Sequence, residues 1–381
     1  MAEGAGEVVV GFDAKRLVRN RTGLGNYARF VAESLACFSP EIRQVHSASG
    51  AGNPALYGHL KAYPSFRLLT PALKGLPFGD FLWRNFTSRG PLLRRGVQLY
   101  HGLSGELPAS IRKWGIPSVV TMHDLIYELF PQFYSRIDAR LYHEKYRRSC
   151  LDADCIVAVS ACTKRDLVRL YGIPEEKVRV IYQGCDPAFR EPATEEKLRE
   201  VRQRYGLESP FVLSVGTIEE RKNALSLVRA LSLSEDKKLQ LLLVGRETKY
   251  TEKVREEADR PDLKGRVRIL SGVPFSDLPA LYRLAEVFAY PSLYEGFGIP
   301  VLEALNSGTP VVAGAGSCLE EAGGSGSLYA DPRDPADLAR KLEEARERRE
   351  EMIPAGKAWA ERFLPEKSAP ELAALYRSLV K

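Results

Sequence analysis

The chain has 381 residues, 44% of them hydrophobic and 27% charged, which is typical of a globular protein and unlike a disordered one. No apolar run approaches the roughly 18 to 20 residues of a membrane-spanning helix. The acidic first residues lack the basic region of a signal peptide, so we expect a cytoplasmic protein. Residues 1–185 hold 25 Lys and Arg against 16 Asp and Glu, while the remainder holds 30 against 33. Both an anionic partner of the first half and chance variation in a solvated surface fit this asymmetry.

Short apolar runs alternate with amphipathic stretches along the whole chain. The first half predicts a helix over 26–38 and strands over 7–12, 97–101, 117–122, 155–159 and 178–182. The second half predicts helices over 225–233 and 363–379 and strands over 211–215, 239–244, 267–270, 287–290 and 310–313. Nearly continuous apolar strands that alternate with helices indicate parallel sheets covered on both faces.

We therefore predict two doubly wound α/β domains, 1–185 and 186–362, and a terminal segment 363–381. The boundary falls where glycine and two prolines interrupt regular structure. Sheets of this kind bind ligands outside the carboxyl ends of their strands, which favours a cleft between the domains as the site.

The segment 291–304 combines several features of a nucleotide-sugar site. Pro300 suits the first position of a helix, which we therefore expect to begin there, and the amides around Gly298 to Leu302, that of Ile299 included, favour a phosphate group. We place Glu303 in the first turn of this helix, where its carboxylate can accept two hydrogen bonds from a vicinal diol. Glu295, eight residues earlier, can do the same for a second polyhydroxyl ligand. A diphosphate between two diol-binding carboxylates is the outline of a nucleotide sugar.

This segment resembles the E-x7-E signature of the family 4 retaining glycosyltransferases, which have the GT-B fold of two facing Rossmann-like domains. The resemblance extends over nearly the whole chain. It implies that Glu295 and the backbone of Phe297 and Gly298 hold hydroxyls of the donor sugar. It also implies that Glu303 holds the nucleotide ribose.

A second motif, Gly216 to Asn223, directly follows a predicted strand. Its adjacent cations Arg221 and Lys222 can neutralise the charge that develops on a leaving diphosphate. The resemblance assigns the diphosphate contact to Lys222. Many relatives carry an arginine where this chain has Thr217, and Arg221 is the candidate for the missing charge.

A third segment places Gly23 and Gly25 between a predicted strand and helix, just before Tyr27. The two glycines permit close approach of the backbone to a ligand, although a tight structural turn explains them equally well. The resemblance implies a glycine loop that faces the donor phosphates and the acceptor.

His123 and Asp124 follow the predicted strand 117–122. A histidine at this position is chemically suited to act as a general base. The resemblance instead implies that His123 binds a donor-sugar hydroxyl, with Asp124 to orient it. His101, from the end of a neighbouring strand, is a weaker candidate.

Smaller matches complete the resemblance. The loop from Ser271 to Val273 is similar to one whose backbone meets the nucleobase, and Gly245 fits a tight turn near the nucleotide. The segment 317–321 resembles a Ser-x-x-Pro-Glu loop, with Glu320 in place of proline. The predicted helix in 363–381 resembles the last helix of the family, which implies that it crosses back to the N-terminal domain.

The sequence predicts no metal site and no cofactor. The six cysteines form no C-x-x-C pair, so we expect reduced and mostly buried thiols. Asp152 and Asp154 match the D-x-D pattern of metal-dependent transferases but lie just before strand 155–159, away from the donor motifs. We interpret them as helix-end and strand-start charges.

The aromatic and basic segment 78–95 allows two interpretations. It can lie on an anionic membrane surface beside a lipid-linked acceptor. An amphipathic core helix with exposed arginines is the alternative that we favour.

Together these observations predict a retaining hexosyltransferase that carries mannose from GDP-mannose to a glycan or lipid-linked acceptor, as in the bacterial surface-polysaccharide mannosyltransferases that the motifs resemble. A UDP-hexose or a GDP-linked deoxysugar as donor, a sugar-nucleotide epimerase and a catalytically silent nucleotide-sugar binder are the alternatives. We find no nucleic-acid recognition motif and expect no nucleic-acid partner.

Overall fold

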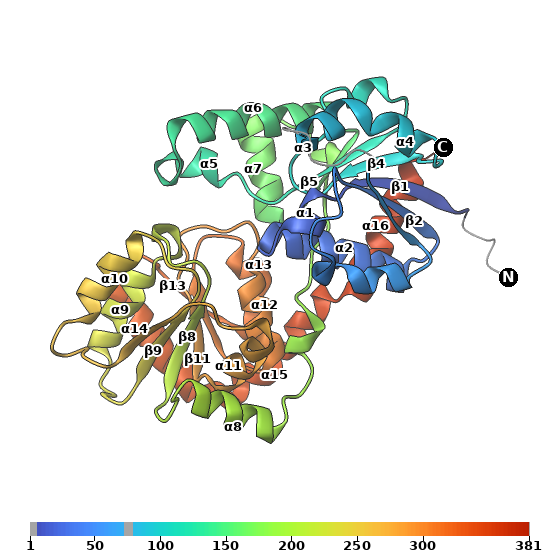
Figure 1. The fold of residues 1–381 in the computed structure, drawn as a ribbon. Coiled ribbons are helices and arrows are strands. Elements are labelled where there is room, and N and C mark those ends of the chain that lie inside the picture. Colours follow the sequence, from blue (N-terminus) through green and yellow to red (C-terminus); the bar gives the residue numbers. More distant parts are fainter. Residues whose placement is uncertain (1–5, 72–78, 381) are drawn as a thin grey trace. The chain divides into compact units, whose positions relative to one another are not determined.

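The computed structural model describes residues 6–71 and 79–380. The chain forms two compact units (Figure 1). Unit 1 comprises residues 1–184 together with 363–381, and unit 2 comprises residues 185–362. The carboxyl-terminal residues of the chain therefore belong to the same unit as its amino-terminal half.

Unit 1 is built on a seven-stranded parallel sheet in the order β3-β2-β1-β4-β5-β6-β7. The strands are β1 (Val8–Asp13), β2 (Ile42–Ser47), β3 (Phe66–Leu69), β4 (Leu99–Gly102), β5 (Ser118–Met122), β6 (Cys155–Ala158) and β7 (Val178–Val180). Five of these were predicted to within two residues at each end. The strands β2 and β3 were not predicted, because Arg43, Gln44 and His46 interrupt the apolar pattern of β2 and Arg67 interrupts that of β3.

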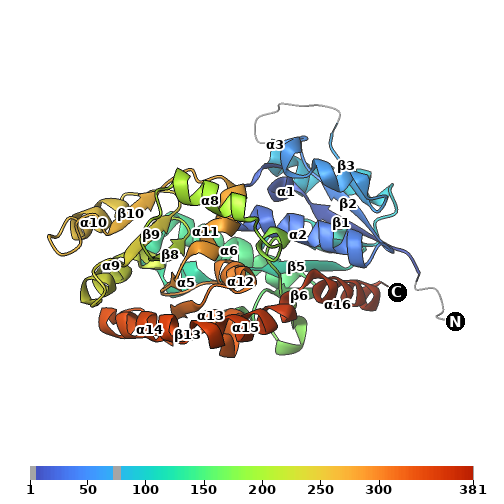
Figure 2. The same ribbon diagram turned by 90° about the horizontal axis from the view of Figure 1, so that it is seen from below.

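Unit 2 contains a six-stranded parallel sheet in the order β10-β9-β8-β11-β12-β13. Its strands are β8 (Phe211–Val215), β9 (Gln240–Val244), β10 (Val267–Leu270), β11 (Val287–Tyr290), β12 (Val311–Gly314) and β13 (Leu328–Ala330). All were predicted except the short β13. The predicted doubly wound, parallel α/β architecture is confirmed in both units, and Figure 2 shows the helices on the faces of the sheets.

Helices cover both sheets. Unit 1 contains α1 (Lys15–Arg19), α2 (Gly23–Phe38), α3 (Gly79–Leu82), α4 (Arg89–Leu93), α5 (Ile126–Leu129), α6 (Arg136–Asp152), α7 (Ala161–Tyr171) and α16 (Pro365–Leu379), and α16 packs against α2. Unit 2 contains α8 (Glu195–Arg204), α9 (Ala224–Leu233), α10 (Tyr250–Ala258), α11 (Leu278–Leu284), α12 (Ile299–Ser307), α13 (Leu319–Gly323), α14 (Pro335–Glu347) and α15 (Arg349–Ala360). Among the residues that the structure describes, no helix is both long enough and apolar enough to cross a membrane.

The order of the strands determines where each unit can bind a ligand. In unit 1 the direction of winding reverses between β1 and β4, and in unit 2 it reverses between β8 and β11. The loops that follow such a pair leave in opposite directions and open a crevice at the carboxyl ends of the strands. In both units, predicted site residues lie in loops that begin at these ends.

Candidate nucleotide-sugar site

The two central strands of unit 2 carry the two strongest motifs. Residues 216–223 follow β8, and residues 291–298 connect β11 to α12. The loops are joined by a hydrogen bond of 2.8 Å from the amide of Leu293 to the carbonyl of Arg221. Asn223, at a left-handed φ of 58°, donates from its side-chain amide to the carbonyl of Pro291 at 3.3 Å. The structure thus brings together two segments that are about 70 residues apart in the sequence.

Glu295 is the centre of a compact ionic cluster. Its Oε1 lies 2.9 Å from Nζ of Lys222 and 2.7 Å from Nη1 of Arg221. Tyr290 and Ser292 donate to the same oxygen at 3.1 and 2.8 Å. We find no protein partner for Oε2 of Glu295 in the described part of the chain. That oxygen is an acceptor suited to a ligand hydroxyl.

The cluster determines the charge of its members. Burial alone raises the pKa of Glu295, but Lys222 and Arg221 outweigh burial and hold this pKa at about 2. Burial lowers the pKa of Lys222, and Glu295 more than reverses this, so its pKa lies above the usual value. Both cations and the carboxylate are therefore ionised at neutral pH, and their side chains are only 13–18% exposed.

The amino-terminus of α12 adds backbone donors to this site. The helix begins at Ile299, one residue before the predicted start at Pro300, and Gly298 has a φ of 122° that excludes most other residues. A Cβ at Gly298 would lie 2.8 Å from the Leu319 side chain. Within the described residues, the amides of Gly298 and Ile299 have no protein acceptor. These donors and the helix dipole favour an anionic or polyhydroxyl ligand.

Glu303 does not lie in the first turn of α12, so that prediction was wrong. The helix begins at Ile299, which places Glu303 in the second turn, where Tyr282 donates to its Oε2 at 2.7 Å. Burial raises the pKa of Glu303 to about 7, against the opposing effect of the Tyr282 hydrogen bond. A carboxylate so close to its titration point changes its charge near neutral pH, unlike Glu295.

The predicted glycines of unit 2 lie where backbone segments pack closely. Gly216 follows β8 under the aliphatic stem of Lys222, where a Cβ would be 3.1 Å from Cδ of Lys222. A Cβ on Gly245 would lie 1.8 Å from the carbonyl oxygen of Gly216, so only glycine allows the two loops to meet. Val273 is partly exposed in the loop after β10, next to Ser271, whose hydroxyl donates to the Gly245 carbonyl at 3.0 Å.

In unit 1, the glycine segment forms the beginning of α2. The helix begins at Gly23, three residues before its predicted start, so both predicted glycines lie inside its first turn. A Cβ on Gly25 would lie 2.0 Å from the carbonyl oxygen of Asn20, so the packing of the backbone requires glycine at this position. A Cβ on Gly23 would meet open space, so packing does not require glycine there. The amides of Gly23 and Leu24 have no protein acceptor in the described part of the chain and are potential ligand donors.

His123 follows β5 and is held in a defined tautomer. Its Nε2 lies 2.9 Å from the carbonyl oxygen of Leu103, which can only accept, so Nε2 carries the hydrogen. Burial lowers the pKa of His123 to about 4, so the ring is neutral at neutral pH. Its Nδ1 has no protein partner in the described residues and can accept a hydrogen bond from a ligand hydroxyl. A neutral acceptor of this kind suits ligand binding better than a base with a pKa near 7.

The auxiliary candidates have different surroundings. Asp124 accepts a hydrogen bond of 3.1 Å from the amide of Ile126, the first residue of α5. Tyr27 is buried, and its ring meets His123 edge-on with centroids 4.6 Å apart. His101 is 0% exposed, and both ring nitrogens have protein partners, so it is not available to a ligand.

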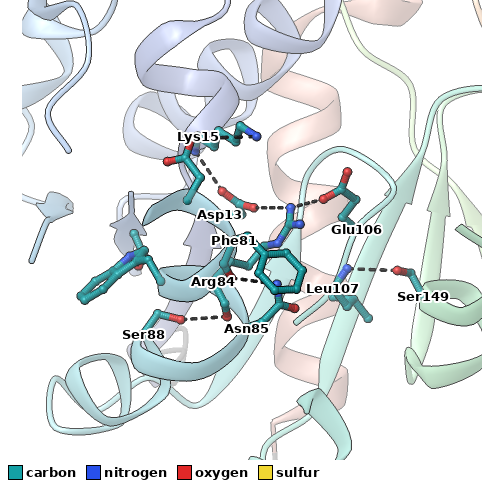
Figure 3. A network of polar contacts seen from close by, with 12 residues as sticks. Asp13, Lys15, Phe81, Arg84, Asn85, Ser88, Glu106, Leu107 and Ser149 are labelled. Atoms are coloured by element: carbon teal, nitrogen blue, oxygen red, sulfur yellow. Dashed lines mark hydrogen bonds and ion pairs between the residues drawn. The ribbon is translucent and has the colours of Figure 1, made fainter. Parts of the chain in front are cut away.

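Sequence reasoning missed a buried ionic network at the carboxyl ends of β1 and β4. Nη1 of Arg84 lies 3.4 Å from Asp13 and also pairs with Glu106 (Figure 3). Glu106 in turn pairs with Lys145. Burial raises the pKa of Asp13, whereas Arg84 and Lys145 outweigh burial and lower the pKa of Glu106. The arginine belongs to the segment 78–95, where the sequence analysis expected exposed arginines, and no local pattern in the sequence indicates its distant carboxylate partners.

The rest of that segment corrects our preferred interpretation of it as a core helix. Residues 79–93 form α3, a π-helical stretch and α4, and Phe78 lies outside the described residues. Trp83 donates to Ser47 at 2.8 Å. Phe81 and Phe86 are instead 55% and 66% exposed and pack edge to face, with centroids 6.1 Å apart.

The remaining predictions concern possible metal ligands. Asp152 ends α6 and pairs with Arg112 at 2.7 Å, and Asp154 accepts from the Ser118 amide at 2.7 Å before β6. The helix-end and strand-start interpretation is therefore confirmed. All six cysteines are free thiols, and four of them are buried.

Comparison with known proteins agrees with this architecture. Residues 28–189 match Glycosyltransferase Family 4, and residues 197–359 match Glycosyl transferases group 1. O-antigen chain mannosyltransferase B of Escherichia coli is 28% identical over 338 residues, which cover 82% of this chain and 84% of that protein.

Two solved structures show the same fold. HepE of Anabaena, in complex with UDP and glucose, has a TM-score of 0.73 at 19% identity, covering 98% of this chain and 100% of its own. Sucrose-phosphate synthase of Thermosynechococcus elongatus has a TM-score of 0.77 at 22% identity, covering 98% and 99% of the two chains.

The fold and the motifs together define the class. Two parallel α/β units with these neighbours constitute a GT-B fold, the scaffold of a large class of glycosyltransferases. Within that class, the two sequence matches determine the family. The chain belongs to the family 4 glycosyltransferases.

Proposed function

We propose that the chain is a retaining hexosyltransferase that transfers mannose from GDP-mannose to a glycan or lipid-linked acceptor in surface-polysaccharide assembly. The observation that carries this proposal is the cluster of Lys222, Arg221 and Glu295 beside the amino-terminus of α12. It places two cations, a hydroxyl-accepting carboxylate and free backbone amides at the carboxyl ends of β8 and β11. A sugar diphosphate needs these three kinds of group.

The cations have the capacity to bind the diphosphate. The Lys222 ammonium has three donors, two of which go to Tyr290 and Glu295, and the third would meet a phosphate oxygen. Because Lys222 and Arg221 are held in place before the ligand arrives, they need little reorganisation as charge develops on the leaving group. These side chains supply positive charge without a divalent ion, so we propose a metal-free reaction.

The remaining groups bind the sugar and the ribose. Oε2 of Glu295 and Nδ1 of His123 would each accept a hydrogen bond from a sugar hydroxyl, and Glu303 would hold the ribose diol. In a front-face reaction, the departing phosphate oxygen takes the proton of the acceptor hydroxyl as the glycosidic bond forms with the same configuration. No protein base is then required, which agrees with the neutral His123 and the low pKa of Glu295.

The choice of donor rests on the sequence relatives. O-antigen chain mannosyltransferase B is a mannosyltransferase by name and aligns over most of both chains. HepE, which was solved with UDP and glucose, is similar in fold at 19% identity. GDP-mannose is therefore our proposed donor, and a UDP-hexose or a GDP-linked deoxysugar is the alternative.

We also propose that unit 1 contacts the inner face of the cytoplasmic membrane beside a lipid-linked acceptor. The supporting feature is the exposed pair Phe81 and Phe86, with Arg89, Arg94 and Arg95 exposed in the same segment. Exposed aromatic rings near basic side chains suit an anionic bilayer surface. Flotation with phosphatidylglycerol vesicles would test this contact, because a variant with F81S and F86S should lose binding that the unaltered protein shows.

The donor assignment is tested with purified protein and a panel of nucleotide sugars. We expect GDP-mannose to raise the melting temperature selectively and to release GDP slowly without acceptor, with and without a chelator. Lys222→Ala should lower kcat strongly, whereas Lys253→Ala, at an exposed position on α10, serves as the matched control. Selectivity for a UDP-sugar would overturn the donor, and loss of activity with a chelator would overturn the metal-free reaction.

Other outcomes would change the enzyme class. Binding of the donor without release of GDP in the presence of candidate acceptors would indicate a silent nucleotide-sugar binder. Deuterium incorporation from solvent into the free nucleotide sugar would indicate an epimerase. No response to any nucleotide sugar would refute the proposed function as a whole.

A further inference from the structure

A chain of hydrogen bonds runs through the interior of unit 1 from α16 to the first turns of α2. The phenol oxygen of Tyr376 lies 2.6 Å from Nδ1 of His101, whose Nε2 lies 2.8 Å from Oγ1 of Thr121. The phenol oxygen of Tyr27 lies 3.1 Å from the same Oγ1. None of the four residues is more than 4% exposed, so their polar atoms must find partners inside the protein.

The protonation state of His101 determines how donors and acceptors alternate along this series of hydrogen bonds. Burial, with a smaller contribution from His123, lowers the pKa of His101 to about 3, so its ring is neutral and has one donor and one acceptor nitrogen. If Tyr376 donates to Nδ1, then Nε2 donates to Thr121 and Thr121 donates to Tyr27. The opposite assignment runs from Tyr27 to Tyr376. In both cases, removal of one hydroxyl leaves a buried polar atom unpaired, which makes the network act as a unit.

The network ends against a predicted ligand residue. The Tyr27 ring meets the His123 ring edge-on, with centroids 4.6 Å apart and an angle of 90° between the planes. Thr121 lies in β5 only two residues before His123. His123 itself has one side-chain anchor, the bond from Nε2 to the Leu103 carbonyl, and a packed wall formed by Tyr27. The orientation of Tyr27 therefore limits the rotation of the His123 ring.

The surroundings of the network are apolar, which makes its polar groups costly. The Phe12 ring packs against His101 and Tyr376, with centroids 5.9 and 6.3 Å away, and is fully buried. Apolar side chains could fill this space without the desolvation cost of two hydroxyls and an imidazole. A satisfied polar network, unlike an apolar core, specifies one arrangement of the groups that it joins.

We propose that Tyr376, His101 and Thr121 are positioning residues for His123. Through the Tyr27 hydroxyl they fix the ring against which His123 packs, and so keep Nδ1 of His123 directed toward the ligand. This inference rests on the proposed function, in which Nδ1 accepts a hydrogen bond from a sugar hydroxyl. It assigns a role to a histidine that cannot touch a ligand and to a helix that follows unit 2 in the sequence but belongs to unit 1.

Three conservative variants test the inference without a substrate. Thr121→Val and Tyr376→Phe each delete one hydroxyl and keep the shape, whereas Thr121→Ser keeps the hydroxyl and is the matched control. Proton–nitrogen NMR of the imidazole rings reports the hydrogen bonds of each histidine. We expect Thr121→Val and Tyr376→Phe to shift the His101 nitrogens and to shift or broaden the His123 signal. Thr121→Ser should leave His123 unchanged, and the melting temperatures should show that all three variants fold.

Kinetics with the donor provide the second measurement. We expect kcat to fall about fivefold in Thr121→Val and Tyr376→Phe, the effect of one weakened hydrogen bond, with little change in KM for the acceptor. Thr121→Ser, which keeps the hydroxyl, should have a kcat close to that of the unaltered protein. Unchanged His123 signals and kcat in folded Thr121→Val and Tyr376→Phe would overturn the inference. If no nucleotide sugar binds, the proposed function fails, but the NMR measurement still decides whether the network positions His123.

Discussion

Glu295→Gln is the substitution that tests the ionic cluster most directly. It keeps the shape of the side chain and removes the negative charge that Lys222 and Arg221 share at 2.9 and 2.7 Å. The pKa of Glu295 in the folded protein is about 2, below its usual value of 4.5. A shift of this size corresponds to about 3 kcal/mol of stability. We therefore expect the variant to destabilise unit 2 by about 3 kcal/mol, because two buried cations lose their partner.

The pH dependence follows from the direction of this shift. Because the folded pKa is depressed, the stabilisation is fully present above pH 4.5 and is lost as the pH falls toward 2. Calorimetry at pH 7.5 should therefore show a melting transition lowered by about 6 to 12 °C in Glu295→Gln. Below about pH 3 the difference from the unaltered protein should shrink.

A surface ion pair in the same unit serves as the control. Glu351 pairs with Arg348 at 2.8 Å, but the Glu351 side chain is 66% exposed. Glu351→Gln should leave the melting temperature nearly unchanged, because solvent screens such pairs. If Glu295→Gln were as harmless as Glu351→Gln, the assignment of Glu295 as the buried centre of the cluster would be refuted.

Three further predictions concern both units. Glu303 has a folded pKa of about 7, raised from 4.5, so its contribution to stability is present below pH 4.5 and lost as the pH rises through 7. In thermal melts, Glu303→Gln should raise the stability of unit 2 over that of the unaltered protein more at pH 8 than at pH 5. Equal effects on the melting temperature at both pH values would contradict the raised pKa. The same substitution should raise KM for the donor. Gly298→Ala should lower the stability of unit 2 by about 2 kcal/mol in thermal melts, because alanine disfavours a φ of 122° and its Cβ would contact Leu319. An unchanged melting temperature would show that α12 can shift to accommodate the side chain. Arg84→Met should lower the free energy of unfolding of unit 1 by about 3 kcal/mol in denaturant titrations, because Glu106 loses a buried partner. If Arg84→Lys has the stability of the unaltered protein, a positive charge at this position is sufficient.

Much of the fold could be predicted because parallel α/β proteins have a simple sequence pattern. Fully buried strands such as β6, β11 and β12 are continuous apolar runs, and all three were predicted. The edge strands β3 and β13 are short and only partly buried, so they carry no such run. The interrupted β2 was missed although most of it is buried, because Gln44 and His46 are polar. Gln44 donates to the Ala32 carbonyl and pairs with Nε2 of His46, and the sequence does not reveal these contacts.

Some features of the site could likewise be predicted from the sequence, and others could not. The positions of Lys222, Glu295 and His123 at strand ends follow from strand lengths, which the sequence shows. That Lys222 and Glu295 meet in one ion pair does not follow, because they are 73 residues apart and belong to different loops. The missed partners Tyr290 and Tyr282 are aromatic residues that look like ordinary core residues until their hydroxyls are placed next to the glutamates.

The sequence by itself determined the two-domain parallel architecture, the family resemblance and the chemical types available to the site. Those properties depend on periodicity and on short motifs, which are local along the chain. Only the tertiary structure decided that Glu295 is ionised and Glu303 is close to its titration point, that Arg84 faces inward, and that His101 lies in a buried network. The physical reason is that burial and distant partners set pKa values and hydrogen bonds, and both arise only when separate segments pack together.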